Sequence, residues 1–176
     1  THIQSELVPL GVAGRDVLGQ SRTGTGKTAA FGLPLLHRLA ENPSPFSGLV
    51  LCPTRELAIQ IAKDLQALAG DLPVKIMPVY GGQRMKVQSD KLKKGPHILV
   101  GTPGRVMDFH QRGELPYDNI QMAVLDEVDR LLDIGFRDDI RRILGGMTQK
   151  HQPIIVSATI SEEIERLARK YLTDPE

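Results

Sequence analysis

The acidic segment MAVLDEVDRLLD, residues 122–133, contains residue types and spacings that could bind a cation. Four apolar residues lead directly into Asp126, Glu127 and Asp129. Because carboxylates this close in sequence repel one another, a bound cation would explain why they gather where an apolar run ends. Mg²⁺ prefers oxygen ligands and keeps part of its water shell. The segment is therefore a candidate metal site, with a solvated acidic turn as the alternative.

A second segment, GQSRTGTGKTAAF, has the composition of a loop that binds phosphate groups. Gly24 and Gly26 allow backbone N–H groups to close around phosphates, and Lys27 can reach the terminal phosphates. Thr28 places a hydroxyl at the start of a predicted helix, where it could bind Mg²⁺. The pattern is that of a P-loop, and a Gly-rich turn before a helix is the alternative. The nucleotide-binding residues predicted on this loop are Ser21, Arg22, Thr23, Gly24, Thr25, Gly26, Lys27 and Thr28.

Strands and helices that alternate along the chain must position these segments. Short apolar runs predict buried strands at 16–19, 48–52, 75–80, 97–101, 122–126 and 153–157. Helical spacing predicts helices at 28–40, 55–70, 84–95, 137–147 and 161–172, and a further helix after the TPGR motif. Such alternation predicts an α/β fold with a mainly parallel sheet and helices on both faces. Ligands of such folds bind outside the carboxyl ends of the strands.

The ends of two helices are marked in the sequence. Gly70 follows a helical pattern where a C-cap is expected, and Ser161 precedes one as an N-cap. The segment ENPSPFSG, residues 41–48, has the Pro, Ser and Gly content of a loop. The lysines between Arg84 and Lys94 are predicted to form a solvated helix face.

The two chemical segments can act together only if the fold brings them to one edge of the sheet. If residues 122–125 form the strand beside the P-loop strand, Asp126 emerges at the same edge as Thr28, and both could hold Mg²⁺. Glu127 would then orient and deprotonate the water that attacks the γ-phosphate of a nucleotide. Lys27, Asp126 and Glu127 are the predicted catalytic residues.

The composition limits the class of protein. The formal net charge is +1 with His neutral, so a nucleic-acid partner must be held by local groups rather than by a global basic field. The single cysteine, Cys52, excludes an internal disulfide and is expected in the core. No apolar run approaches the ~20 residues that span a bilayer, and the first ten residues lack the features of a signal peptide. We expect a soluble, cytoplasmic protein without a membrane partner.

Five short motifs carry a resemblance to a known family. GTGKT, PTRELA, TPGR, DEVD and SAT follow one another in the order found in the N-terminal RecA-like domain of the DEAD-box RNA helicases, and the chain resembles that domain over nearly its whole length. The resemblance implies ATP and Mg²⁺ as cofactors and an RNA-dependent ATPase that separates short RNA duplexes. It also implies a second RecA-like domain that supplies arginine fingers. Residues 1–176 are therefore expected to be one RecA-like ATP-binding domain of a longer polypeptide, monomeric and nearly inactive alone.

Two further positions bear on nucleotide binding and on packing beside the site. THIQ resembles the end of the family's Q motif, in which Gln4 would read the edge of adenine. Val128 stands where the family usually has alanine, and overpacking beside the site could cost about 1 to 3 kcal/mol unless the local pocket is larger. Because the three acids are present, we expect the chemistry to survive. Ser21, in place of the first P-loop glycine, is usual for the family.

Three loops are implied to hold the sugar-phosphate backbone of one RNA strand. The residues concerned are Pro53, Thr54, Arg55, Gly81, Gly82, Thr102, Gly104 and Arg105. PTRELA and TPGR each place backbone N–H groups and a guanidinium between a strand and a helix N-terminus. Contacts of this kind predict sequence-independent, salt-sensitive binding. On the residues alone, a simple turn or a surface ion pair is the stronger explanation of each loop.

The SAT motif is implied to couple ATP to strand separation. Ser157 and Thr159 would be hydrogen-bond partners of the acidic segment through Asp129; on the residues alone, an ordinary cap before the last helix is the stronger explanation. Two other functions stay open. One is a DNA-directed helicase-type motor, which the PTRELA and TPGR pair disfavours; the other is a non-enzymatic RNA-binding scaffold, which would not need Lys27, Asp126 and Glu127 together.

Overall fold

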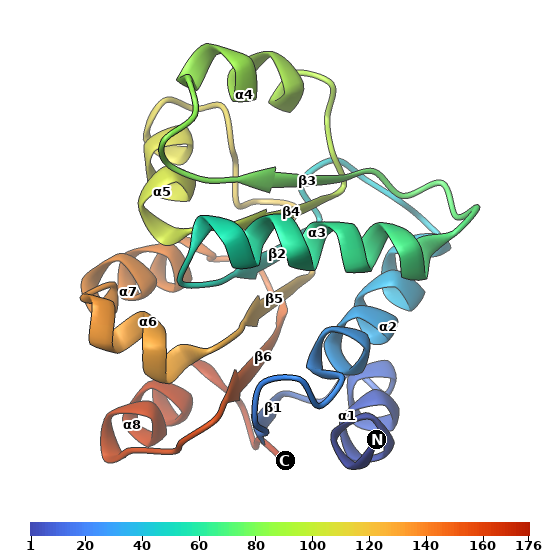
Figure 1. Cartoon of the computed structure of the whole chain (residues 1–176), viewed down its shortest axis with the longest axis vertical. Helices are drawn as coiled ribbons and strands as arrows, with labels where there is room; N and C mark the ends of the chain where they lie inside the picture. The colour runs from blue at the N-terminus through green and yellow to red at the C-terminus, as the bar shows by residue number, and fades with distance from the viewer.

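The computed structural model describes residues 1–176 as a six-stranded parallel sheet with eight helices (Figure 1). The strands are β1 (Val17–Gln20), β2 (Gly48–Leu51), β3 (Ile76–Val79), β4 (Ile98–Gly101), β5 (Met122–Leu125) and β6 (Gln152–Ser157). The helices are α1 (His2–Val12), α2 (Lys27–Ala40), α3 (Arg55–Ala69), α4 (Met85–Leu92), α5 (Pro103–Gln111), α6 (Val128–Ile134), α7 (Arg137–Gly146) and α8 (Glu162–Tyr171). No helix has both the length and the apolar character needed to cross a membrane.

The strand order is β1-β6-β5-β2-β4-β3, and every neighbouring pair is parallel. The expectation that the strand of residues 122–125 lies beside the P-loop strand is wrong, because β6 lies between β5 and β1. Burial explains the arrangement. All six residues of β6 are buried, whereas β1 ends on the exposed Gln20, so β6 takes an interior place and β1 an edge.

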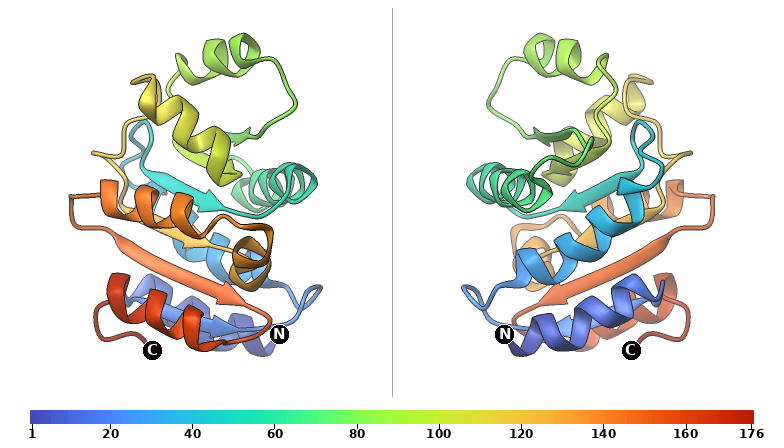
Figure 2. Two further views of the ribbon diagram at one scale, coloured as in Figure 1. Left: turned by 90° about the vertical axis from the view of Figure 1, so that its left-hand side faces the viewer. Right: turned by 90° about the vertical axis from the view of Figure 1, so that its right-hand side faces the viewer.

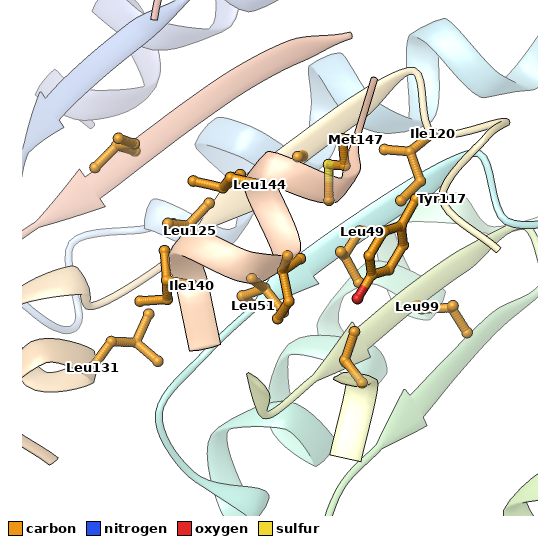
Figure 3. Packing of buried hydrophobic residues seen from close by; sticks show 14 of the residues in the cluster. Leu49, Leu51, Leu99, Tyr117, Ile120, Leu125, Leu131, Ile140, Leu144 and Met147 are labelled. Atoms are coloured by element: carbon orange, nitrogen blue, oxygen red, sulfur yellow. The ribbon is translucent and has the colours of Figure 1, made fainter. Parts of the chain in front are cut away.

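Alternate strand residues face two separate apolar layers. In β5, Met122 and Val124 pack in a cluster with residues of α1, α2 and α3, while Ala123 and Leu125 pack in a cluster with residues of α5 to α8. Figure 2 shows these helix groups on opposite faces of the sheet. In Figure 3, Leu125 lies near Ile140 of α7 in the second cluster. The predicted helices on both faces are therefore confirmed.

Two helices were not predicted. Pro9 and the short apolar spacing hide α1 in the sequence, yet Ile3 and Leu7 are buried on one of its faces. A Cβ at Gly11 would lie 2.6 Å from Pro34 Cγ, so the glycine allows α1 to pack closely against α2. The second, α6, has only seven residues and follows the acidic motif directly. Such a length is too short for a clear helical period.

The predicted ends of two helices are confirmed. Gly70 follows α3 as its C-cap with φ 54°. Ser161 is the N-cap of α8, and its hydroxyl accepts a hydrogen bond from the backbone N–H of Ile164 at 3.3 Å.

Candidate functional site

The P-loop joins β1 to α2 at the carboxyl edge of the sheet. Gly24 and Gly26 have φ angles of 79° and 84°, which glycine adopts without the steric cost that a side chain would meet. Gly26 is the N-cap of α2, and Lys27 is the first residue of the helix. The N–H groups of the first helical turn have no partners within the helix. The loop therefore offers the donors and the backbone shape of an anion cradle.

Polar contacts fix the shape of the loop. The backbone N–H of Ser21 donates to the Ser157 carbonyl at 2.9 Å, which fastens the loop to β6. The hydroxyl oxygens of Ser21 and Thr25 lie 2.5 Å apart, and the Thr25 hydroxyl donates to the Arg22 carbonyl at 2.6 Å. Arg22 and Thr23 are exposed. Among the predicted nucleotide residues, Ser21 and Thr25 thus support the loop, while Arg22 and Thr23 border open space.

Lys27 and Asp126 face each other across the site. Lys27 Nζ lies 3.4 Å from Asp126 Oδ1, and the two side chains are 7% and 3% exposed. The contact is an ion pair without hydrogen-bond geometry, since Nζ is buried and has no hydrogen-bond partner. Buried donors are nearly always paired, so this ammonium group is suited to a further oxygen ligand. The pair also brings the P-loop and the acidic segment together although β6 separates their strands.

The charge of Asp126 is costly in its surroundings. Burial raises the pKa of Asp126 above the usual aspartate value, and the nearby Lys27 ammonium offsets part of this rise. The Asp126 carboxylate also accepts a hydrogen bond from the backbone N–H of Glu127 at 3.0 Å. Its own backbone N–H donates to the Leu51 carbonyl at 2.9 Å, which holds it at the junction of β5 and β2. A cation beside this carboxylate would favour its ionised form.

Glu127 occupies a strained turn between β5 and α6. Its φ and ψ angles are 52° and 51°, a left-handed conformation that is uncommon outside glycine. The side chain is 13% exposed, and Oε2 lies 3.4 Å from Arg130 Nη1. Strained backbone of this kind gathers at functional sites, where the surrounding structure maintains it.

A cavity of about 610 Å³ lies between the P-loop and the acidic segment. It is lined by P-loop residues that include Lys27 and Thr28, by Asp126 and Glu127, and by one face of α3. No group of three or more His, Cys, Asp or Glu side chains forms a metal-binding cluster. Mg²⁺ often binds through one or two protein oxygens together with phosphate and water, and Thr28 and Asp126 fit that pattern. The unpartnered Lys27 ammonium and the glycine cradle fit a nucleotide phosphate chain.

Gln4 lies against the P-loop. Its Nε2 donates to the Gly26 carbonyl at 3.2 Å, across the contact between α1 and the loop. The predicted adenine-reading residue is therefore beside the phosphate cradle, and its amide contacts the loop directly.

The hydrogen bonds expected between the SAT motif and Asp129 are present. The Thr159 backbone N–H and hydroxyl donate to Asp129 Oδ2 at 3.2 and 3.0 Å. The Ser157 hydroxyl accepts from the Asp129 backbone N–H at 3.1 Å. Partial burial tends to raise the pKa of Asp129, but its hydrogen bonds from Thr159, Arg130 and Ser157 together hold it below the usual aspartate value. The acidic segment and the end of β6 are thus joined by an ionised carboxylate.

The three predicted RNA-binding loops lie at the carboxyl ends of β2, β3 and β4, which are neighbouring strands. Thr54 is the N-cap of α3, and its hydroxyl accepts from the Leu57 backbone N–H at 3.2 Å. Pro53 is buried. Thr102 is the N-cap of α5 without such a side-chain bond, and a Cβ at Gly104 would meet nothing within 4 Å. The Thr102 hydroxyl therefore lacks the capping hydrogen bond that the Thr54 hydroxyl makes, and Gly104 borders open space.

The two arginines of these loops differ in their surroundings. Arg105 donates from Nη1 to the Gln83 carbonyl at 3.0 Å, and its side chain is 12% exposed. It therefore joins the loop after β4 to the loop after β3. Arg55 is exposed and forms no ion pair or side-chain hydrogen bond; its guanidinium carbon lies 5.4 Å from the centroid of the Tyr80 ring. A Cβ at Gly82, where φ is 84°, would lie 3.3 Å from Arg55 Nη1.

Val128 is accommodated by the core beside the site. Its side chain is fully buried in the cluster that covers the α5 to α8 face of the sheet. The larger side chain therefore points away from solvent and packs with the apolar layer under the acidic motif.

A family model described as DEAD/DEAH box helicase matches residues 1–167. The chain belongs to the DEAD/DEAH box helicase family. Its acidic tetrapeptide is Asp-Glu-Val-Asp, and the P-loop, the acids and the SAT motif of this family member meet at one sheet edge.

Curated relatives within the family match the whole chain. It is 46% identical over 176 residues to the DEAD-box ATP-dependent RNA helicase CshA of Bacillus cereus, and covers 34% of that protein. It is 44% identical to the protein of the same name from Bacillus subtilis, and covers 36% of it. The chain thus spans about a third of the length of these relatives.

Solved structures of helicases share the fold. A DEAD box protein from the hyperthermophile Methanococcus jannaschii matches with a TM-score of 0.93 and 38% identity. A hypothetical ATP-dependent RNA helicase from Sulfolobus tokodaii matches with a TM-score of 0.92 and 34% identity. Both matches cover this whole chain, and 48% and 51% of the respective structures. The RecA-like P-loop fold class is therefore confirmed.

Sequence reasoning did not single out three residues near the sites. Arg130 contacts Glu127, Tyr80 contacts Arg55, and Gln88 is buried beside the loop after β3. A buried glutamine within a lysine-rich helix has no pattern that distinguishes it from solvated neighbours. Arg130 follows Glu127 by three residues, and this helical spacing could have indicated their contact.

Proposed function

We propose that residues 1–176 are a single RecA-like ATP-binding domain of a cytoplasmic, RNA-dependent ATPase that hydrolyses ATP to ADP and phosphate and separates short RNA duplexes. A second RecA-like domain of the same longer polypeptide completes the enzyme. The observation that carries the proposal is the buried Lys27 ammonium, which lies 3.4 Å from Asp126, lines the same cavity and has no hydrogen-bond partner. The names of the CshA relatives, ATP-dependent RNA helicases, agree with it.

Residues of the P-loop bind and orient the triphosphate. The N–H groups at the start of α2 and the Lys27 ammonium neutralise phosphate oxygens, so Lys27 exchanges its single contact with Asp126 for a phosphate ligand. Gln4, already in contact with Gly26, provides an amide for the adenine edge. The Lys27 and Asp126 side chains are almost fully buried, so water has little access to the ion pair that they form.

Thr28 and Asp126 are the residues that would hold Mg²⁺, with the remaining positions filled by phosphate and water oxygens. When bound, Mg²⁺ supplies positive charge that stabilises the developing charge on the phosphates. Glu127 accepts the proton of the attacking water. Its contact with Arg130 is long, at 3.4 Å, so the carboxylate can turn to a water molecule in the cavity.

RNA is bound through its sugar-phosphate backbone at the loops after β2, β3 and β4. Arg55 offers an exposed guanidinium, and Gly82 and Gly104 allow close approach of the backbone. The hydrogen bonds from Thr159 to Asp129 connect the end of β6 to the acidic segment, and through them the nucleotide state is coupled to strand separation.

The deciding experiment is the ATPase rate of the full-length protein, with and without RNA, for the wild type and for Glu127→Gln. The variant should bind nucleotide normally and hydrolyse it roughly 10²- to 10⁴-fold more slowly, because it lacks the base. A normal rate in the variant would remove Glu127 from this role.

Competition between matched RNA and DNA strands separates an RNA enzyme from a DNA motor, since only RNA offers 2′-hydroxyl contacts. RNA affinity that is equal with and without an ATP analogue would favour the scaffold.

The isolated 176 residues are expected to bind adenine nucleotide weakly, to hydrolyse it barely and not to unwind RNA. In related phosphoryl-transfer enzymes, arginine fingers from a partner domain raise kcat about 10³- to 10⁵-fold. The isolated 176 residues are expected to act without such a contribution. Robust RNA-stimulated turnover by these residues would refute the need for a second domain.

A further inference from the structure

Arg55 has an unusual support for an exposed arginine. It has no carboxylate or carbonyl partner, and its guanidinium lies over the ring of Tyr80 at 5.4 Å from the centroid. A ring face attracts a guanidinium but leaves the N–H donors at its edge unpaired. The contact therefore restricts where the guanidinium lies without occupying the groups that would bind a phosphate.

Tyr80 is itself fixed by a buried side chain from α4. Gln88 is fully buried, its Oε1 accepts from the Tyr80 N–H at 3.0 Å, and its Nε2 donates to the Tyr80 carbonyl at 2.9 Å. The last paired residue of β3 is Val79, so Tyr80 lies just beyond the sheet ladder. Gln88 thus gives Tyr80 the two bonds that a neighbouring strand would otherwise give.

The loop after Tyr80 is fastened at its other end as well. Arg105 donates to the Gln83 carbonyl, two residues after Gly81. Between these two attachments, Gly82 adopts a positive φ and comes close to the Arg55 guanidinium. The loop is therefore held at both ends in a shape that brings a ring and a glycine backbone against one arginine.

We propose that Tyr80 and Gln88 are positioning residues for RNA binding: Gln88 fixes the end of β3, and the Tyr80 ring holds Arg55 ready for a backbone phosphate. The proposal rests on the function proposed above, in which Arg55 contacts RNA. Arginine has high side-chain entropy, and holding it in place before binding lowers the entropy lost in the complex. Neither Tyr80 nor Gln88 needs to touch RNA for this effect.

The test measures RNA affinity of the full-length protein, with a single-stranded RNA and an ATP analogue, for Arg55→Ala, Tyr80→Ala and the double variant. Arg55→Ala should weaken binding most. Tyr80→Ala should weaken it roughly two- to fivefold, the value of an exposed cation–π contact. In the Arg55→Ala background, Tyr80→Ala should have no further effect, because its influence passes through Arg55.

Conservative and distant variants separate positioning from stability. Tyr80→Phe keeps the ring and should restore wild-type affinity. Tyr171→Ala removes another ring that lies under a cation, that of Lys170 on α8, and should leave RNA affinity unchanged. In RNA-stimulated hydrolysis, Tyr80→Ala should raise the KM for RNA while kcat at saturating RNA stays the same.

Gln88→Met keeps the shape of the buried side chain but removes both bonds to Tyr80. It should reproduce the RNA defect of Tyr80→Ala, with thermal unfolding used to select conditions in which the variant is folded. Wild-type RNA affinity in folded Gln88→Met would overturn the role of Gln88.

The possible failures are distinguishable. If Arg55→Ala binds RNA normally, the RNA role of Arg55 fails and the positioning role fails with it. If Arg55→Ala weakens binding but Tyr80→Ala does not, or if the two effects add in the double variant, the function stands and the positioning role is overturned.

Discussion

Lys27 and Arg55 occupy equivalent places, yet their surroundings are opposite. Each is the first residue of a helix that follows a strand at the carboxyl edge of the sheet. Lys27 is 7% exposed and faces the equally buried Asp126, whereas Arg55 is exposed and lies on an aromatic ring. Removing one partner of a buried ion pair is strongly destabilising, because the other charge stays buried without compensation. An exposed cation contributes little free energy on its own and acts with its neighbours on the surface. The nucleotide site should therefore respond to substitution sharply, and the RNA surface gradually.

The largest expected effect comes from applying one substitution to both cations. Lys27→Met leaves the buried Asp126 without its counter-charge and should lower the free energy of unfolding by about 3 kcal/mol. Arg55→Met removes an exposed charge and its contact with the Tyr80 ring, and should lower it by at most about 1 kcal/mol. Urea unfolding of the two variants measures the difference. Equal losses would contradict the contrast between the sites.

The second effect concerns the carboxylate that joins the acidic segment to the SAT motif. Asp129→Asn weakens charge-assisted hydrogen bonds from Thr159 and Arg130 and should cost about 1 kcal/mol at pH 7. Because the folded pKa of Asp129 lies below its unfolded value, its contribution is complete above about pH 3.9 and is lost as the pH falls through the folded pKa.

The difference between wild type and Asp129→Asn, measured by urea unfolding, should therefore shrink in acid. Asp133→Asn is the matched control, since Asp133 is exposed on the same helix and forms no hydrogen bond or ion pair. A difference that grew on acidification would contradict the assigned direction of the pKa.

The third effect compares adjacent glycines on the RNA side. Gly82→Ala places a side chain at φ 84° and 3.3 Å from Arg55, and should destabilise the fold by about 1 kcal/mol. Gly81→Ala meets nothing within 4 Å and has no positive φ, so its cost should stay below about 0.5 kcal/mol. Thermal unfolding of both variants distinguishes them, and equal shifts would show that the loop tolerates a side chain at Gly82.

The smallest expected effect concerns the chemical reactivity of the Cys52 thiol and leaves stability unchanged. Cys52 is fully buried at the end of β2, and burial together with the nearby Asp126 charge raises the pKa of its thiol. A maleimide should therefore label it in native buffer only as fast as the chain unfolds. Glu56→Cys adds an exposed thiol on α3 and should be labelled rapidly in the same chain. Rapid labelling of Cys52 would mean that this strand end opens to solvent.

Local signals predicted the strands and most helices, because buried strands and amphipathic helices leave short-range patterns. The P-loop was also visible, since its glycines and lysine act within one loop. The order of strands was not visible: the interior place of β6 depends on how its fully buried residues compete with those of β1 for neighbours. The bonds of Gln88 were hidden although Tyr80 is nearby in sequence, because a buried glutamine in a lysine-rich helix has no pattern that separates it from solvated neighbours. The left-handed backbone at Glu127 was hidden because a glutamate does not mark such a turn in the sequence.

The interior position of β6 gives Ser157 contacts on two sides. Its carbonyl receives the P-loop N–H of Ser21, and its hydroxyl receives the N–H of Asp129. A movement of either segment must therefore stretch a bond to the same residue, and α8 follows this residue after a short turn. A spectroscopic probe on the outer surface of α8 would consequently register events at the phosphate loop and at the acidic turn as one signal.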